Sequence, residues 1–152
     1  MHVVLVNPLI PQNTGSISRL CAGTNSDLHL VGQLGFSLDD KLLKRAGLDY
    51  WPGVRLHIHR DFDALLAQYP PRPMALFSSH ATRPYSEFVA TDDAWLVFGQ
   101  ETKGLPPELR TRFGGDLYKI PISGHVRSLN LATSVGIALY DGLRQLGFPT
   151  LT

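Results

Sequence analysis

Short apolar runs alternate with helical patterns along this chain, and no other feature constrains its fold as strongly. Residues 3–6 read VVLV, an unbroken apolar run that is typical of a strand buried on both faces of a parallel sheet. The same reasoning predicts strands at 28–31, 54–59, 74–79, 95–99 and 117–120, and helices at 13–22, 37–47, 61–69, 106–113 and 128–146. Strands that alternate with helices in this way predict an α/β fold with a mainly parallel sheet flanked by helices.

Composition narrows the class of protein further. The 152 residues are 43% hydrophobic and show no linker, repeat or low-complexity segment, so a single domain over 1–152 is expected. No run of 18 apolar residues predicts a membrane span, and the N-terminus lacks the basic leader of a signal peptide. The single cysteine, Cys21, cannot form an internal disulfide, which favours a cytoplasmic location, and we expect it in the core. A net charge of +1 does not by itself indicate nucleic-acid binding.

Three loops that follow expected strands contain most of the candidate functional residues. They read NPLIPQNTG at 7–15, FGQETKGLP at 98–106 and IPISGHVRS at 120–128. Because ligands of open α/β sheets bind outside the carboxyl ends of the strands, these loops are expected to meet. None contains GxxxxGK[ST], and no GxGxxG follows the first strand, which argues against a P-loop or a Rossmann-type dinucleotide site. Gly99 and Gly104 either allow a close backbone approach or simply form turns.

The residues around two of these loops predict helix starts. Asn13 or Thr14 is expected to cap the helix after the first loop, and Ser128 and Asn130 can accept hydrogen bonds from the first N–H groups of the last helix. A turn-rich loop that leads into a helix N-terminus suits a polar ligand, although this stretch taken alone favours an ordinary C-terminal packing helix. The buried stripe of the last helix is expected to comprise Leu131, Val135, Ala138, Leu139, Leu143 and Leu146. Its thin side, which suits close packing against a partner, comprises Ala132, Ser134, Gly136 and Ala138.

Taken together, the loops resemble the signature motifs of the SPOUT RNA methyltransferases. The matching segments are IPQNTGSISRLCAGT, FGQETKGLPPEL and YKIPISGHVRSLNLATSVGIALY. The segment LGFSLDDKLLKRAGLDYW is similar to one in the small branch that methylates the wobble ribose of tRNA. The resemblance covers nearly the whole chain. It implies a deep trefoil knot formed by the C-terminal segment, a homodimer, and S-adenosylmethionine as methyl donor.

The resemblance also assigns roles to residues of this chain. Catalytic roles fall on Arg19 and Asn130, and Glu101 matches a further polar position of the motifs. The expected cofactor-binding residues are Phe77, Gly99, Ile120, Ile122, Ser128 and Leu129. Gln100 and Val126 stand where proline and serine are common, so the first is expected to loosen its loop and the second removes a hydroxyl.

The activity implied by the resemblance is methylation of the ribose 2'-hydroxyl of a cytidine or uridine at the wobble position of tRNA. The guanidinium of Arg19 stays protonated, so it is expected to bind a phosphate or the hydroxyl rather than to act as the base. The residues expected to hold the anticodon stem-loop are Arg19, Lys41, Lys44, Arg45, Lys103 and Arg127. The alternative is an RNA-binding or regulatory module of the same knotted fold without turnover. No metal site is expected, because His57 and His59 share one strand face without a cysteine or carboxylate cluster in evidence.

Overall fold

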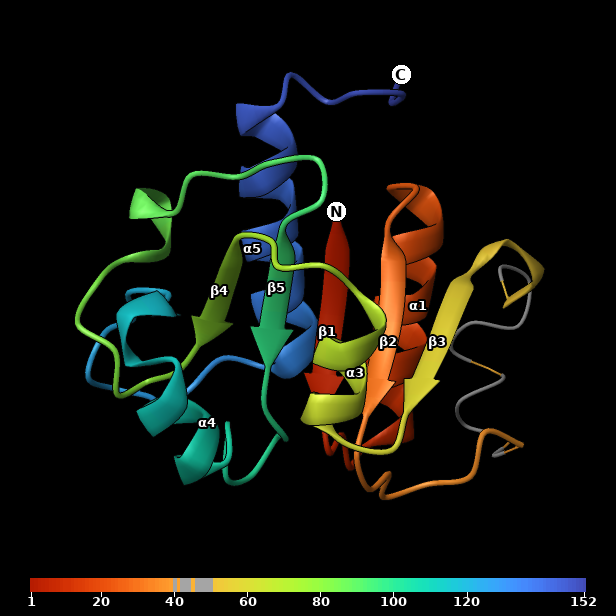
Figure 1. The fold of residues 1–152 in the computed structure, drawn as a ribbon, viewed down its shortest axis with the longest axis horizontal. Coiled ribbons are helices and arrows are strands. Elements are labelled where there is room, and N and C mark those ends of the chain that lie inside the picture. Colours follow the sequence, from red (N-terminus) through yellow and green to blue (C-terminus); the bar gives the residue numbers. More distant parts are fainter. Residues whose placement is uncertain (40, 42–44, 46–50) are drawn as a thin grey trace.

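The computed structural model describes residues 1–39, 41, 45 and 51–152. The helix expected over 37–47, and Lys44 within it, therefore fall largely outside the described residues. In the described part of the chain, six strands form one sheet in the order β3-β2-β1-β5-β4-β6, and every neighbouring pair is parallel (Figure 1). The strands are β1 (His2–Val6), β2 (Asp27–Val31), β3 (Arg55–His59), β4 (Met74–Phe77), β5 (Trp95–Phe98) and β6 (Leu117–Tyr118). The predicted parallel α/β sheet is confirmed, while the threading that would make a trefoil knot stays a prediction.

Helices cover both faces of the sheet. In Figure 1, α1 and α5 lie behind the strands and α3 lies in front of them. The helices are α1 (Pro11–Gly23), α3 (Phe62–Gln68), α4 (Pro107–Arg112) and α5 (Leu131–Gln145), with 3₁₀ turns at Trp51–Gly53, Tyr85–Glu87 and Gly114–Asp116. Val3 and Leu5 of β1 belong to the core on the α1 and α5 side, whereas Val4 and Val6 belong to the core on the α3 side. Both faces of β1 are buried, which is why its sequence shows no polar alternation. No helix in the described part of the chain has the length and apolar character needed to span a membrane.

The sequence predicted the N-cap of α5 correctly and that of α1 wrongly. Helix α1 begins at Pro11, before the expected cap, and its N-cap residue Ile10 makes no side-chain cap bond. Proline suits the first helical turn because its missing N–H would have no partner there. The prediction that Asn13 or Thr14 caps α1 is therefore wrong. In contrast, Asn130 is the N-cap of α5, and its side chain accepts a hydrogen bond from the Thr133 N–H, as expected.

Helix α5 packs on α1 and on β5, and it contacts Met1 at the N-terminus. The predicted stripe is confirmed at Leu131, Val135, Ala138, Leu139 and Leu143, which are buried. A Cβ atom on Gly142 would lie 2.5 Å from the Met1 Cε, so glycine lets the N-terminus cross the helix closely. On the thin side, the nearest atom to a Cβ on Gly136 would be Leu20 Cδ2 of α1 at 3.9 Å. Part of the thin side of α5 therefore packs against α1 of the same chain.

A hydrogen-bonded histidine chain crosses the three strands β1, β2 and β3. His2 Nδ1 lies 2.9 Å from His29 Nε2, and His29 Nδ1 lies 3.0 Å from His59 Nε2. Arg72 Nη1 lies 3.1 Å from His2 Nε2. A guanidinium can only donate, so His2 Nε2 accepts from Arg72. His2 Nδ1 therefore donates to His29 Nε2, and His29 Nδ1 donates to His59 Nε2. Burial lowers the pKa of His2 to about 4 and that of His29 to about 3, so both rings stay neutral near pH 7.

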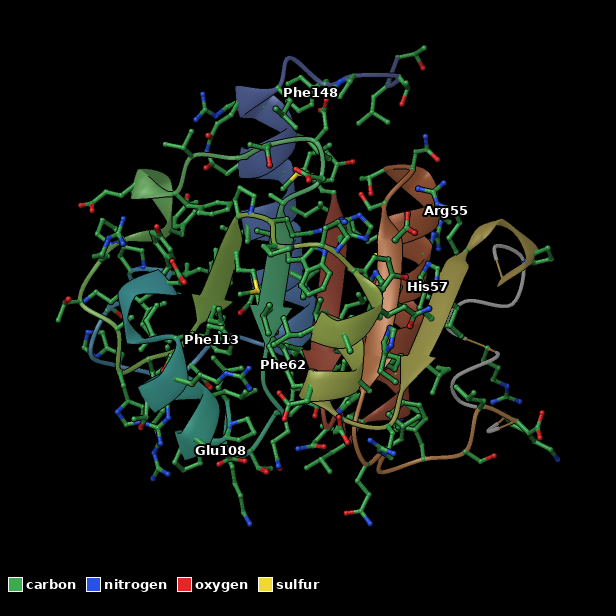
Figure 2. The ribbon with its side chains drawn as sticks, in the orientation of Figure 1. Arg55, His57, Phe62, Glu108, Phe113 and Phe148 are labelled. Atoms are coloured by element: carbon green, nitrogen blue, oxygen red, sulfur yellow. The ribbon has the colours of Figure 1, made fainter. Side chains whose placement is uncertain are left out.

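A carboxylate accompanies these histidines, which the sequence did not reveal. Asp27 Oδ2 lies 2.8 Å from His57 Nε2, and Asp27 Oδ1 accepts from Arg55 Nε at 2.7 Å (Arg55 and His57 are labelled in Figure 2). His2, Asp27 and His29 offer nitrogen and oxygen atoms within 4.8 Å of one another. These side chains already bond to one another and to their neighbours. We therefore assign no metal ion to the cluster.

We expect the histidine chain to make folding stability depend on pH below neutrality. His29 protonates near pH 6.5 when unfolded but only near pH 3 when folded. The unfolded chain therefore binds more protons between these values, so the stabilisation is complete above about pH 6.5 and falls as the pH drops. One fully buried histidine contributes a slope of about 1.4 kcal/mol per pH unit. Urea unfolding between pH 7.5 and 4.5 should show that the free energy of unfolding falls as the pH drops. The slope of this fall should be shallower in His29→Gln than in an exposed control, His125→Gln. Equal slopes in the two variants would contradict the prediction.

Candidate cofactor and RNA site

A cavity of about 350 Å³ lies between the second and third loops, at the carboxyl ends of β4 and β5. In Figure 1 the arrowheads of these strands point towards α4 and the loops around it. The cavity is lined by all of the expected cofactor-binding residues, namely Phe77, Gly99, Ile120, Ile122, Ser128 and Leu129. The structure thus brings together residues that are up to 52 positions apart, from 77 to 129. Their binding to a cofactor stays a prediction.

The cavity has an apolar wall and a loop with open backbone groups. Phe77 and Phe98 end paired strands, and their rings stack with centroids 4.6 Å apart and an interplanar angle of 8°. Residues 122–128 are exposed, and apart from a turn at 124–125 the N–H groups of this segment have no backbone acceptor among the described residues. Buried or ligand-facing amides need acceptors. The arrangement therefore suits a ligand with a planar apolar part and several polar atoms.

The second loop is a tight turn that needs both of its glycines. The N–H of Gln100 donates to the Gly104 carbonyl at 3.2 Å, and the N–H of Gly104 donates back at 3.0 Å. A Cβ atom on Gly99 would lie 2.0 Å from the Gly104 carbonyl carbon, and Gly104 has a φ of +68°. Gly99 therefore serves close backbone approach, and Gly104 serves a left-handed turn. Gln100 supplies an N–H that proline lacks, so it adds a bond to the turn rather than loosening it.

One polar network joins all three loops. The carboxylate of Glu101 accepts from the backbone N–H groups of Leu9 at 2.8 Å and Ile10 at 3.0 Å, and from Asn13 Nδ2 at 3.2 Å. Asn13 Oδ1 in turn accepts from Asn130 Nδ2 at 3.0 Å. The prediction that the loops meet is confirmed. Asn13, which the sequence suggested as a helix cap, instead connects the first loop to the other two.

The network gives Asn130 a positioning function. Its Oδ1 caps α5, and its Nδ2 holds Asn13 on α1. These bonds fix α1 relative to the cavity loops. They do not bring Asn130 into the cavity wall, which runs through Leu129 and Leu131 on either side of it. A direct catalytic role for Asn130 stays a prediction.

The expected RNA-binding residues fall into two groups. Lys103 and Arg127 line the cavity. Arg19 is exposed on α1, and neither it nor Lys41 or Arg45 lines the cavity of its own chain. Two further cations do line it, Arg110 and Lys119, and the sequence analysis missed both. Arg110 lies just outside the second motif segment, so only the tertiary structure places it there, whereas Lys119 lies within the third segment and was overlooked.

The comparisons with known proteins agree with this geometry. The model of the SpoU rRNA methylase family matches residues 1–140. The chain belongs to the SpoU rRNA methylase family. A similar relative is the tRNA (cytidine(34)-2'-O)-methyltransferase of Burkholderia cenocepacia, 43% identical over 97% of this chain and 96% of its own length.

Solved structures extend the likeness to the SpoU fold. One is from work on the 2-OH methylation of C/U34 on tRNA, with a TM-score of 0.92, 45% identity, and coverage of 96% of this chain and 95% of that one. Another is an AdoMet-bound rRNA methyltransferase from Sinorhizobium meliloti, with a TM-score of 0.85 and 26% identity. It covers 95% of this chain and 56% of that one. One structural neighbour of this chain therefore holds S-adenosylmethionine.

Proposed function

We propose that this protein transfers a methyl group from S-adenosylmethionine to the ribose 2'-hydroxyl of the wobble nucleotide of tRNA, cytidine or uridine at position 34. The observation that carries this proposal is the cavity at the second and third motif loops, which hydrogen bonds of Glu101, Asn13 and Asn130 tie to the first loop. The relatives named above act on this position of tRNA. A tRNA substrate and a buried, unreactive Cys21, whose thiol pKa burial raises to about 12, fit a cytoplasmic enzyme.

The cavity residues fit the donor. The stacked Phe77 and Phe98 offer an apolar surface for the adenine, and the open N–H groups of 122–129 offer donors for its polar atoms and amino-acid part. When bound, S-adenosylmethionine supplies an electrophilic methyl group for a single in-line displacement by the 2'-oxygen. The protein then has to hold the hydroxyl in line with that methyl group.

Arg19 is the residue that we assign to holding the RNA. Its guanidinium binds a phosphate or the 2'-hydroxyl and cannot accept the proton, which leaves to a phosphate oxygen or to water. Arg19 does not line the cavity of its own chain. We therefore propose a homodimer in which Arg19 of one copy faces the cavity of the other.

An apolar surface beside the cavity supports self-association. Ile122, Val126 and Tyr140 are exposed, with 39%, 52% and 46% of their surface accessible. A shallow groove near them is lined by Tyr85, Ile120, Pro121, Ile122, Ser123, Val126, Leu129 and Ile137. Val126, which replaces the hydroxyl expected at its position, adds apolar area to this surface.

The alternative is an RNA-binding or regulatory module that keeps the knotted fold and the cofactor but lacks turnover. It is disfavoured because the polar residues of the motifs, Arg19, Glu101, Ser128 and Asn130, are all present in this chain.

The nucleosides of methylated tRNA test the proposal. After incubation of bulk tRNA with the protein and S-adenosylmethionine, mass spectrometry should detect new 2'-O-methylcytidine or 2'-O-methyluridine at position 34. NAD and ATP should not displace S-adenosylhomocysteine in calorimetry. Binding of tRNA with no methylated product would instead favour the module without turnover, and a methylated base would contradict the proposed reaction.

A further inference from the structure

Four cations line the cavity without a carboxylate partner. Among the described residues, no acidic group lies within ion-pair distance of Lys103, Arg110, Lys119 or Arg127. Elsewhere several arginines do pair with acids, namely Arg55, Arg60, Arg83, Arg112 and Arg144. The acidic residue that lines the cavity, Glu101, directs its carboxylate to the N–H groups of Leu9 and Ile10. The cavity therefore favours a negatively charged group.

Arg110 differs from the other three cations because part of it is buried. Its Nε has no accessible surface and no hydrogen-bond partner among the described residues. Native structures rarely leave a buried donor without an acceptor, and for a charged group the cost is larger than for a neutral one. Because not even a water molecule reaches this Nε, a ligand in the cavity would meet the terminal nitrogens of the guanidinium.

The position of Arg110 is set by the packing of α4. Leu109 is buried in the α3-side core, and the ring of Phe113 meets that of Phe62 edge-on at 5.6 Å (both rings are labelled in Figure 2). Arg112 also pairs with Asp63 of α3, but both side chains are exposed and the pair adds little to this packing. These contacts hold one side of α4 against α3, which leaves Arg110 on the side that lines the cavity.

We propose that Arg110 is a ligand-positioning residue that binds an oxyanion inside the cavity. Its guanidinium presents its two terminal nitrogens as a planar fork, which matches the two oxygens of a carboxylate or a phosphate. The oxyanion is the carboxylate of S-adenosylmethionine or a phosphate of the bound RNA. This inference rests on the proposed function and adds to it a residue outside the three motif loops.

Two binding measurements identify the oxyanion. S-adenosylhomocysteine carries the carboxylate, whereas 5'-methylthioadenosine shares its adenosine and sulfur but lacks the carboxylate. If Arg110 binds the carboxylate, Arg110→Gln should weaken S-adenosylhomocysteine about tenfold or more and leave 5'-methylthioadenosine unchanged. If it binds an RNA phosphate, Arg110→Gln should weaken tRNA binding. The slope of log affinity against log salt concentration should also become shallower by about one.

Matched variants separate this role from a structural one. Arg112→Gln removes an exposed arginine from the same helix and should leave both affinities unchanged, because exposed ion pairs contribute little. Arg110→Lys keeps the charge but loses the fork, so it should recover the affinity only in part. Thermal unfolding should show that all three variants remain folded.

Wild-type affinities for both ligands in Arg110→Gln would overturn this inference while leaving the proposed function intact. A wild-type protein that bound neither S-adenosylhomocysteine nor tRNA would overturn both.

Discussion

Arg19→Ala is expected to lower methyl transfer by about 10²–10³-fold or more while leaving the affinity for S-adenosylhomocysteine almost unchanged. Arg19 is exposed on α1 and does not line the cavity of its own chain, so its loss should not disturb the cofactor wall. The permanent charge of its guanidinium suits transition-state positioning of a phosphate or hydroxyl. A radiolabelled methyl-transfer assay and calorimetry measure the two effects. Arg60→Ala, an exposed arginine at the end of β3, is the control and should keep full activity.

Mixed dimers test whether Arg19 acts across an interface. Light scattering at micromolar concentration should first show a dimer. Arg19→Ala mixed with Gly99→Ala, in which the turn that forms the cavity wall is disrupted, should then recover up to one working site in each mixed dimer. The recovered site combines the intact cavity loops of one copy with the intact Arg19 of the other. No recovery, with subunit exchange shown separately, would mean that Arg19 serves its own chain or is not catalytic.

Gly99→Ala is expected to abolish cofactor binding and to destabilise the fold. The added Cβ would lie 2.0 Å from the Gly104 carbonyl carbon and 2.1 Å from the Leu105 nitrogen, distances that backbone atoms cannot tolerate. The turn from 100 to 104 would have to open, with a loss of about 1–3 kcal/mol in the free energy of unfolding, as for an overpacked core. Because this turn forms the cavity wall, S-adenosylhomocysteine should no longer bind measurably in calorimetry.

The control for this variant is Gly115→Ala. A Cβ atom there meets nothing within 4 Å, so both stability and cofactor affinity should stay near those of the wild type. If Gly99→Ala bound S-adenosylhomocysteine as well as Gly115→Ala does, the tight turn would not be a requirement of the site.

The family resemblance predicted which residues would line the cavity, but it did not predict how the loops are held together. Phe77, Gly99 and Ser128 were expected at one site, and the structure places them around one cavity. The links between the loops were missed because Asn13 resembles a helix cap in the sequence. Pro11 allows α1 to begin earlier, so the Asn13 side chain is directed to Glu101 and Asn130 instead.

The sequence by itself determined the sheet. Apolar runs such as 3–6, separated by helical patterns, can bury their side chains only in a parallel sheet covered on both faces, and this follows from local periodicity. The tertiary structure alone decided which polar groups meet. His2, His29 and His59 form a chain because of the register of three strands, and Arg110 lines the cavity because α4 packs against α3. Such contacts depend on the positions of whole elements in space, which the local spacing of residues does not encode.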